Sequence, residues 1–268
     1  MEKLNLNPDP RLEPAPERTG FDYGVAVAKA GTIAFPFLGL GVTLFDLITT
    51  PLRGKRLSDW LEELRLRINE LSQRVASLTP ARLAQDEAFN SAFAQAAQAV
   101  LRTHQREKLD ALRNAVLNVA LGKDSNADRQ TQFLALVDRF TAAHLTLLRF
   151  FQDPAGHFGQ KHLPVTTVSI GTNLLAYELV CAALPELRQQ LQSPAQEHTA
   201  AAFQIFQVLF DDLNSAKLIS LQRIKDNEAW IIPRFTAQPI PYPVNPVTTH
   251  LGEDFLAFIT EPSEAARS

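Results

Sequence analysis

The side chains of this chain that could do chemistry are few and scattered. The single cysteine, Cys181, lies in the apolar run LLAYELVCAAL, which indicates a buried structural thiol rather than a nucleophile. The six histidines show no H-E-x-x-H spacing, and neither Gly39 nor Gly41 is followed by the Lys-Ser or Lys-Thr of a phosphate-binding loop. No serine stands in a G-x-S-x-G elbow. The sequence therefore predicts no catalytic, cofactor-binding or metal-ligating residue and no cofactor.

Two of the histidines lie on predicted helical faces whose neighbours indicate their roles. His104 and Glu107 are three residues apart on one predicted helical face, a spacing at which two ligands can share a metal. Arg106 and Lys108 flank them, however, and indicate a solvated, charged face. His144 falls on an apolar stripe, where a hydrogen-bonded core histidine is expected.

The composition is that of a globular protein. Of 268 residues, 46% are hydrophobic and 21% charged, which leaves room for one large domain or two smaller ones. A net charge of -3 argues against a general nucleic-acid binder, which normally carries a basic excess. With one cysteine and no apolar core in its first 24 residues, the chain is expected in the reducing cytoplasm.

The clearest helix pattern runs from Leu57 to Leu78. Two interpretations are open: an ordinary bundle helix, or a helix that binds another protein or a second copy of the chain. Apolar side chains recur at alternating spacings of four and three residues, the pattern of a helix that packs lengthwise on another, at Leu57, Leu61, Leu64, Ile68, Leu71, Val75 and Leu78. The first five of these are the candidate interaction residues.

Residues 25–52 form a hydrophobic segment with no charge from Ala30 to Phe45. Sixteen helical residues would span about 24 Å, short of a hydrocarbon core of about 30 Å, so a transmembrane helix is disfavoured. The segment is either a buried helical hairpin or an element at a membrane interface. In the second case, apolar side chains would enter the interface and basic ones would meet lipid phosphates, and the candidate contacts are Phe35, Phe37, Leu38, Arg53, Lys55 and Arg56.

Residues 81–153 contain no proline and a single glycine, Gly122, so we expect helices joined by short turns. Thr79-Pro80 is a good start for them, with threonine as the cap and proline in the first turn. Apolar stripes over 89–101, 109–119 and 133–151 predict three helices, which make a bundle of at least four with the helix before them.

The predicted organisation has five parts. They are a flexible arm at 1–24, a helical bundle at 25–153, a connector at 154–171, a second domain at 172–261 and a tail at 262–268. In the second domain, three apolar helical segments precede a strand around Trp230, a proline-rich loop and a last helix that begins at Thr248-Thr249.

This order carries a resemblance. Three helices of which the third ends in DDLNSAKLIS, then a strand, a loop and VTTHLGEDFLAFI, resemble a winged-helix module. In addition, LRTHQREKLDALRNAVLN followed by DRFTAAHLTLLRFFQDP is similar to uncharacterised bacterial helical proteins that pair a bundle with such a tail. The resemblance covers roughly residues 57–260 and implies an all-α protein, a helical bundle followed by a winged-helix-like domain with a small β-hairpin. It implies no activity.

The charge of the tail bears on function. Many winged helices bind DNA through their third helix, but residues 195–260 hold four basic and seven acidic side chains, and Asp211 and Asp212 lie on that helix. We therefore expect a non-enzymatic cytoplasmic protein that binds a protein partner or its own copy. The alternatives are a DNA-binding transcriptional regulator and an effector that associates peripherally with the inner membrane through residues 25–52.

Overall fold

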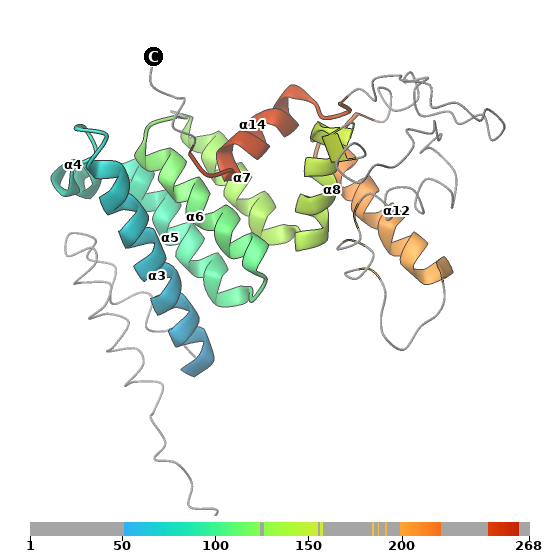
Figure 1. Cartoon of the computed structure of the whole chain (residues 1–268), viewed down its shortest axis with the longest axis horizontal. Helices are drawn as coiled ribbons and strands as arrows, with labels where there is room; N and C mark the ends of the chain where they lie inside the picture. Colours follow the sequence, from blue (N-terminus) through green and yellow to red (C-terminus); the bar gives the residue numbers. More distant parts are fainter. Residues whose placement is uncertain are drawn as a thin grey trace, which may run out of the picture.

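The computed structural model describes residues 51–123, 126–154, 156–157, 184, 187, 191, 199–220 and 246–262. The described part is mostly helical and contains no strand, only an isolated antiparallel bridge between Ile219 and Thr248. The all-α fold class is thereby confirmed for these residues. The helices are α3 (Pro51–Ser72), α4 (Pro80–Gln85), α5 (Glu87–Arg102), α6 (Arg106–Ala120), α7 (Ala127–Arg139), α8 (Ala142–Gln152), α12 (Thr199–Ser215) and α14 (His250–Ile259) (Figure 1).

Four helix starts follow from capping residues visible in the sequence. The side chains of Thr79, Asp86, Asn126 and Thr249 each accept a hydrogen bond from a backbone N–H in the first turn of α4, α5, α7 and α14. The predicted starts at Thr79-Pro80 and Thr248-Thr249 are therefore confirmed. The predicted end of α6 at Gly122 is confirmed too, because Gly122 takes the left-handed conformation, with φ of 68°, that glycine adopts readily.

Two predicted helices have different lengths in the structure. The helix expected over 57–78 begins earlier, at Pro51, and ends at Ser72, after which turns bring Leu78 into the core. The single helix expected over 133–151 is two helices, α7 and α8, because the backbone is extended at Phe140 and Thr141. Periodicity alone missed this break, since both helices place apolar side chains on the same core.

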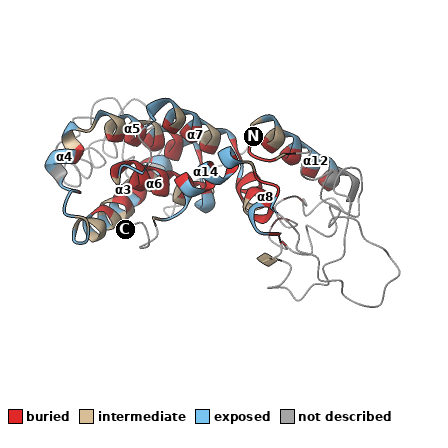
Figure 2. Ribbon diagram, turned by 90° about the horizontal axis from the view of Figure 1, so that it is seen from above, coloured by how far each residue is buried: buried red, intermediate tan, exposed pale blue. Residues whose placement is uncertain are grey.

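Helix α6 is the centre of the bundle. It packs against α3, α5, α7, α8 and α14, and from Asn114 to Ala120 every residue is buried. Figure 2 shows the buried residues gathered where these helices face each other and the exposed residues on their outer sides. Polar contacts also join α3 to α6: the indole N–H of Trp60 donates to the carbonyl of Leu109 at 3.0 Å, and Glu63 forms ion pairs with Arg106 and Arg113.

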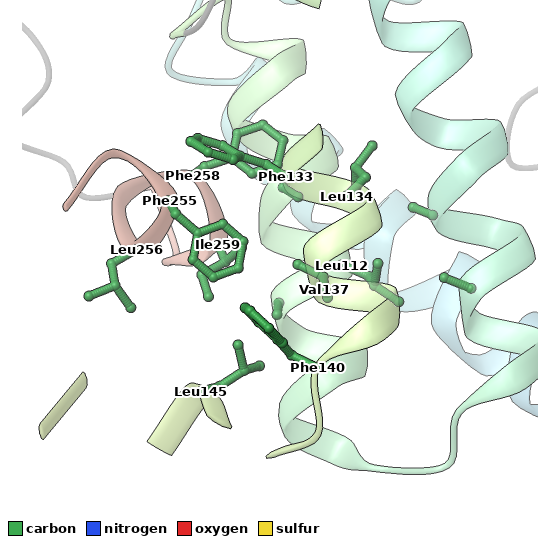
Figure 3. Close-up of a cluster of buried hydrophobic side chains, with 14 of the residues drawn as sticks. Leu112, Phe133, Leu134, Val137, Phe140, Leu145, Phe255, Leu256, Phe258 and Ile259 are labelled. Carbon is green, nitrogen blue, oxygen red and sulfur yellow. The ribbon is translucent and has the colours of Figure 1, made fainter. Parts of the chain in front are cut away.

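The last helix, α14, is packed onto the bundle. Its Phe255 ring meets the edge of Phe133 from α7, and Ile259 lies in the same cluster (Figure 3). The predicted division assigns α14 to the second domain, yet its side chains share the core of the first. The division itself stays a prediction, because most of the connector and the start of the second domain lie outside the described residues.

Three chain segments meet where α14 begins. The N–H of Val247 donates to the carbonyl of Phe151 at the end of α8, and the N–H of Ser220 donates to the carbonyl of Val247, both at 3.0 Å. A Cβ atom on Gly252 would come within 2.1 Å of the carbonyl oxygen of Leu218, so this close approach requires glycine. The strand predicted around Trp230 lies outside the described residues.

Candidate functional site

The predicted interaction residues lie inside the chain's own core. Leu57, Leu61, Leu64 and Ile68 are buried, and Leu71 is partly buried against the same cluster, where α3 packs on α5 and α6. These five side chains thus form the internal packing face of α3, as the interpretation of an ordinary bundle helix requires. A partner would have to displace α5 or α6 to reach them.

The predicted membrane contacts are described only in part. Phe35, Phe37 and Leu38 lie outside the described residues. Arg53 and Lys55 are exposed and Arg56 is half-buried in the first turns of α3, and Leu52 beside them is largely exposed. No helix in the described ranges is both long and apolar enough to span a bilayer.

His144 is a hydrogen-bonded core histidine, as predicted. Its Nδ1 accepts from the backbone N–H of Thr141 at 3.1 Å, so the proton of the neutral ring is on Nε2, which lies 3.2 Å from the Asp212 carboxylate. The ring also stacks on Phe140 at 4.8 Å. Burial lowers the pKa of His144, and the hydrogen bond to Asp212 opposes this without reversing it. A neutral histidine therefore ties α8 to α12.

Acidification is expected to weaken the fold through this contact. Because the pKa of His144 is lower in the folded protein, the unfolded chain binds the proton first, and the free energy of unfolding should fall between about pH 7.5 and about pH 5.5. Urea unfolding at both pH values measures the change. The variant His144→Gln should lose less stability on acidification than the wild type. The control His250→Gln, at an exposed position, should lose as much as the wild type. Equal pH dependence in wild type and His144→Gln would contradict the assignment.

Within the described residues, the other candidate ligands do not come together around a metal ion. His104 and Glu107 are both exposed, and no group of three or more His, Cys, Asp or Glu side chains in the described part of the chain could hold a metal ion. The Nδ1 of His157 is 2.8 Å from the carbonyl of Asp153, a local contact at the end of the bundle. Cys181 lies outside the described residues.

Helix α12 presents an exposed apolar surface that was not predicted above. One face packs on α8, where the Phe210 and Phe151 rings are 5.8 Å apart. Ile205 and Val208, one turn apart beside that face, remain 46% and 58% exposed. We call these two residues the outer flank of α12. The signal was present in the sequence, because neither residue fits the spacing of the buried positions, which are Ala202, Phe206, Leu209 and Leu213.

The chain was compared with protein-family models, with curated proteins and with solved structures. None of the three comparisons finds a match.

Proposed function

We propose that this chain is a non-enzymatic interaction protein that pairs with a second copy of itself through the outer flank of α12. The observation that carries the proposal is the exposure of Ile205 and Val208 on a helix held to the bundle by its other face. Removal of such apolar surface from water is the main driving force of association. Isolated exposed apolar residues are common, and what distinguishes these two is that they lie one turn apart on a helix whose other face packs on α8.

The charge distribution on α12 suits pairing with an identical helix. From Thr199 to Phe210 the helix carries no charged side chain, so two copies would meet there without like-charge repulsion. A two-fold interface places the same patch on both subunits, and an apolar, uncharged patch is complementary to itself. We further propose that this association takes place in the cytoplasm, on the sequence grounds given above.

The double variant Ile205→Glu, Val208→Glu is expected to weaken self-association by more than about tenfold, because it places charges in an interface that excludes water. Light scattering on the full chain over a range of concentrations measures this. The wild type should reach the mass of two 29.7 kDa chains, while the double variant should remain at one.

Gln207→Glu is the matched control, because Gln207 is exposed on the same helix and points away from the outer flank. It should associate like the wild type. A wild type that stays monomeric at every concentration, or a double variant that still dimerises normally, would overturn the proposal.

We also propose that the chain between α12 and α14 has the winged-helix-like arrangement suggested by the resemblance. Its support is the antiparallel pairing of residues 218–220 with residues 247–249, which brings the two ends of this segment together, as the base of a hairpin wing would. NMR chemical shifts over residues 221–245 test it, and helical values throughout would exclude a wing.

The two alternative functions stay predictions. Helix α12, which would enter the DNA major groove, has no lysine or arginine, and it carries Asp211 and Asp212. Its charge therefore gives DNA binding no support. The membrane alternative rests on residues 25–52, most of which lie outside the described residues.

A further inference from the structure

A cavity of about 380 Å³ opens where α5 ends and α6 begins, beside the end of α7. Small-molecule sites in proteins usually occupy about 300–1,000 Å³, so the cavity is large enough for a small metabolite. It is lined by Arg102, Thr103, His104, Gln105, Lys108 and Asp138. Two of the six side chains, Arg102 and Lys108, are basic, and one, Asp138, is acidic.

The single carboxylate of the lining already has a cationic partner. The guanidinium of Arg102 meets the carboxylate of Asp138 through two contacts, of 2.7 and 3.3 Å. Asp138 would repel an incoming anion, but its charge is matched by Arg102. The pair is neutral as a whole, so Lys108 decides the net charge of the cavity, while the Arg102 guanidinium keeps further N–H donors for a ligand.

Lys108 is the unusual member of the lining, because it is a lysine with only 7% of its surface exposed. Its Nζ donates one hydrogen bond, of 2.8 Å, to the backbone carbonyl of Asp138, and an ammonium has three N–H donors. No carboxylate of the described residues forms an ion pair with it. Burial lowers the pKa of Lys108, and the nearby charge of Asp138 only partly offsets this. The ammonium thus lacks a full counter-charge.

The start of α6 adds further positive potential. Its N-cap residue, Gln105, makes no capping hydrogen bond, because its side-chain oxygen accepts from the N–H of Ala142 at the start of α8. The N–H of Lys108 donates to the carbonyl of Gln105, and the two preceding N–H groups of α6 are left without a side-chain cap. The positive end of the helix dipole therefore lies at the cavity, where the first-turn carboxylate of Glu107 offsets part of it. Helix starts of this kind bind phosphates and carboxylates in many proteins.

We propose that this cavity binds a phosphate group, as free phosphate or as a small phosphate monoester, with Lys108, Arg102 and His104 as its cationic and polar contacts. The anion supplies the counter-charge that Lys108 lacks, and it accepts hydrogen bonds from Lys108 and Arg102, which their contacts with Asp138 already hold in place. The site is separate from the α12 surface, so it stands whether or not the chain self-associates.

Titration of the full-length protein with inorganic phosphate and with glycerol 3-phosphate, followed by NMR of the backbone amides, tests the proposal. At least one of the two should produce saturable shifts at residues 103–108, and sodium chloride at equal ionic strength should not. Tighter binding of glycerol 3-phosphate identifies a monoester as the ligand, and equal binding identifies free phosphate. Shifts that stay linear, or that chloride reproduces, would overturn the site.

Two variants test which side chains hold the anion. Lys108→Met keeps the length of the side chain and removes its charge, and it should weaken binding at least tenfold. Arg102→Gln changes an exposed residue, so it should fold normally, and it should also weaken binding. Lys123→Met, the same substitution at an exposed position outside the cavity, should bind like the wild type. Unchanged affinity in either folded cavity variant would contradict the proposed contacts.

Discussion

Replacement of Phe133 by alanine is expected to lower the free energy of unfolding by about 3–5 kcal/mol, the usual range for loss of a buried aromatic ring. Phe133 is 2% exposed, and its ring centroid lies 5.3 Å from that of Phe255 and 5.4 Å from that of Phe258 (Figure 3). Both partners belong to α14, so the substitution leaves a void between α7 and the last helix. Urea unfolding of the full chain, followed by circular dichroism, measures the loss.

Leu66→Ala is the control for this experiment. Leu66 is a large apolar residue of α3 that is 52% exposed, so its truncation should change stability far less. In a double-mutant cycle, Phe133→Ala and Phe255→Ala should cost less together than the sum of their separate effects, because the two rings share one contact. If Phe133→Ala were no more damaging than Leu66→Ala, the packing of α14 on α7 would be wrong.

Replacement of Asn118 by aspartate is expected to destabilise the fold by at least about 3 kcal/mol, although the two side chains have nearly the same shape. Asn118 is 2% exposed on α6, and its side-chain Nδ2 lies 2.8–3.2 Å from the carbonyls of Ala257, Phe258 and Thr260 at the end of α14. Three carbonyl acceptors share the two N–H protons of this amide, which therefore donates hydrogen bonds to carbonyls that have no partner within the last turn of α14. A carboxylate there would face them with a negative charge.

The comparison with Asn118→Leu separates charge from the lost hydrogen bonds. Leucine also leaves the carbonyls unpaired but brings no charge, so its cost should be smaller, about 1–3 kcal/mol. Asn126→Asp is the matched control, because Asn126 caps α7 through its side-chain oxygen and aspartate caps equally well. Thermal and urea unfolding measure all three. A stability of Asn118→Asp equal to that of Asn126→Asp would exclude the docking of α14 through this residue.

Much of the local structure could be predicted because its causes lie within a few residues. Thr79 caps α4, Gly122 ends α6 and Thr249 caps α14, and each of these depends on one side chain and the next turn of backbone. The core role of His144 also followed from its place on an apolar stripe, although its partner Asp212 did not. The apolar spacing of α3 indicated a packing face, but spacing does not say whether another helix of the same chain covers it.

The sequence by itself determined that the described part is helical, where α4 and α14 begin, and which apolar side chains form packing faces. Only the tertiary structure decided which distant segments supply hydrogen-bond partners for each other's buried polar groups. Asn118 and Asn114 interrupt the apolar face of α6 because carbonyls at the end of α14, some 140 residues later, need donors. The cavity beside Lys108 and the exposed flank of α12 likewise exist only once helices far apart in the chain have packed. Local patterns encode propensity and amphipathicity, whereas the pairing of buried polar groups is a property of the assembled core.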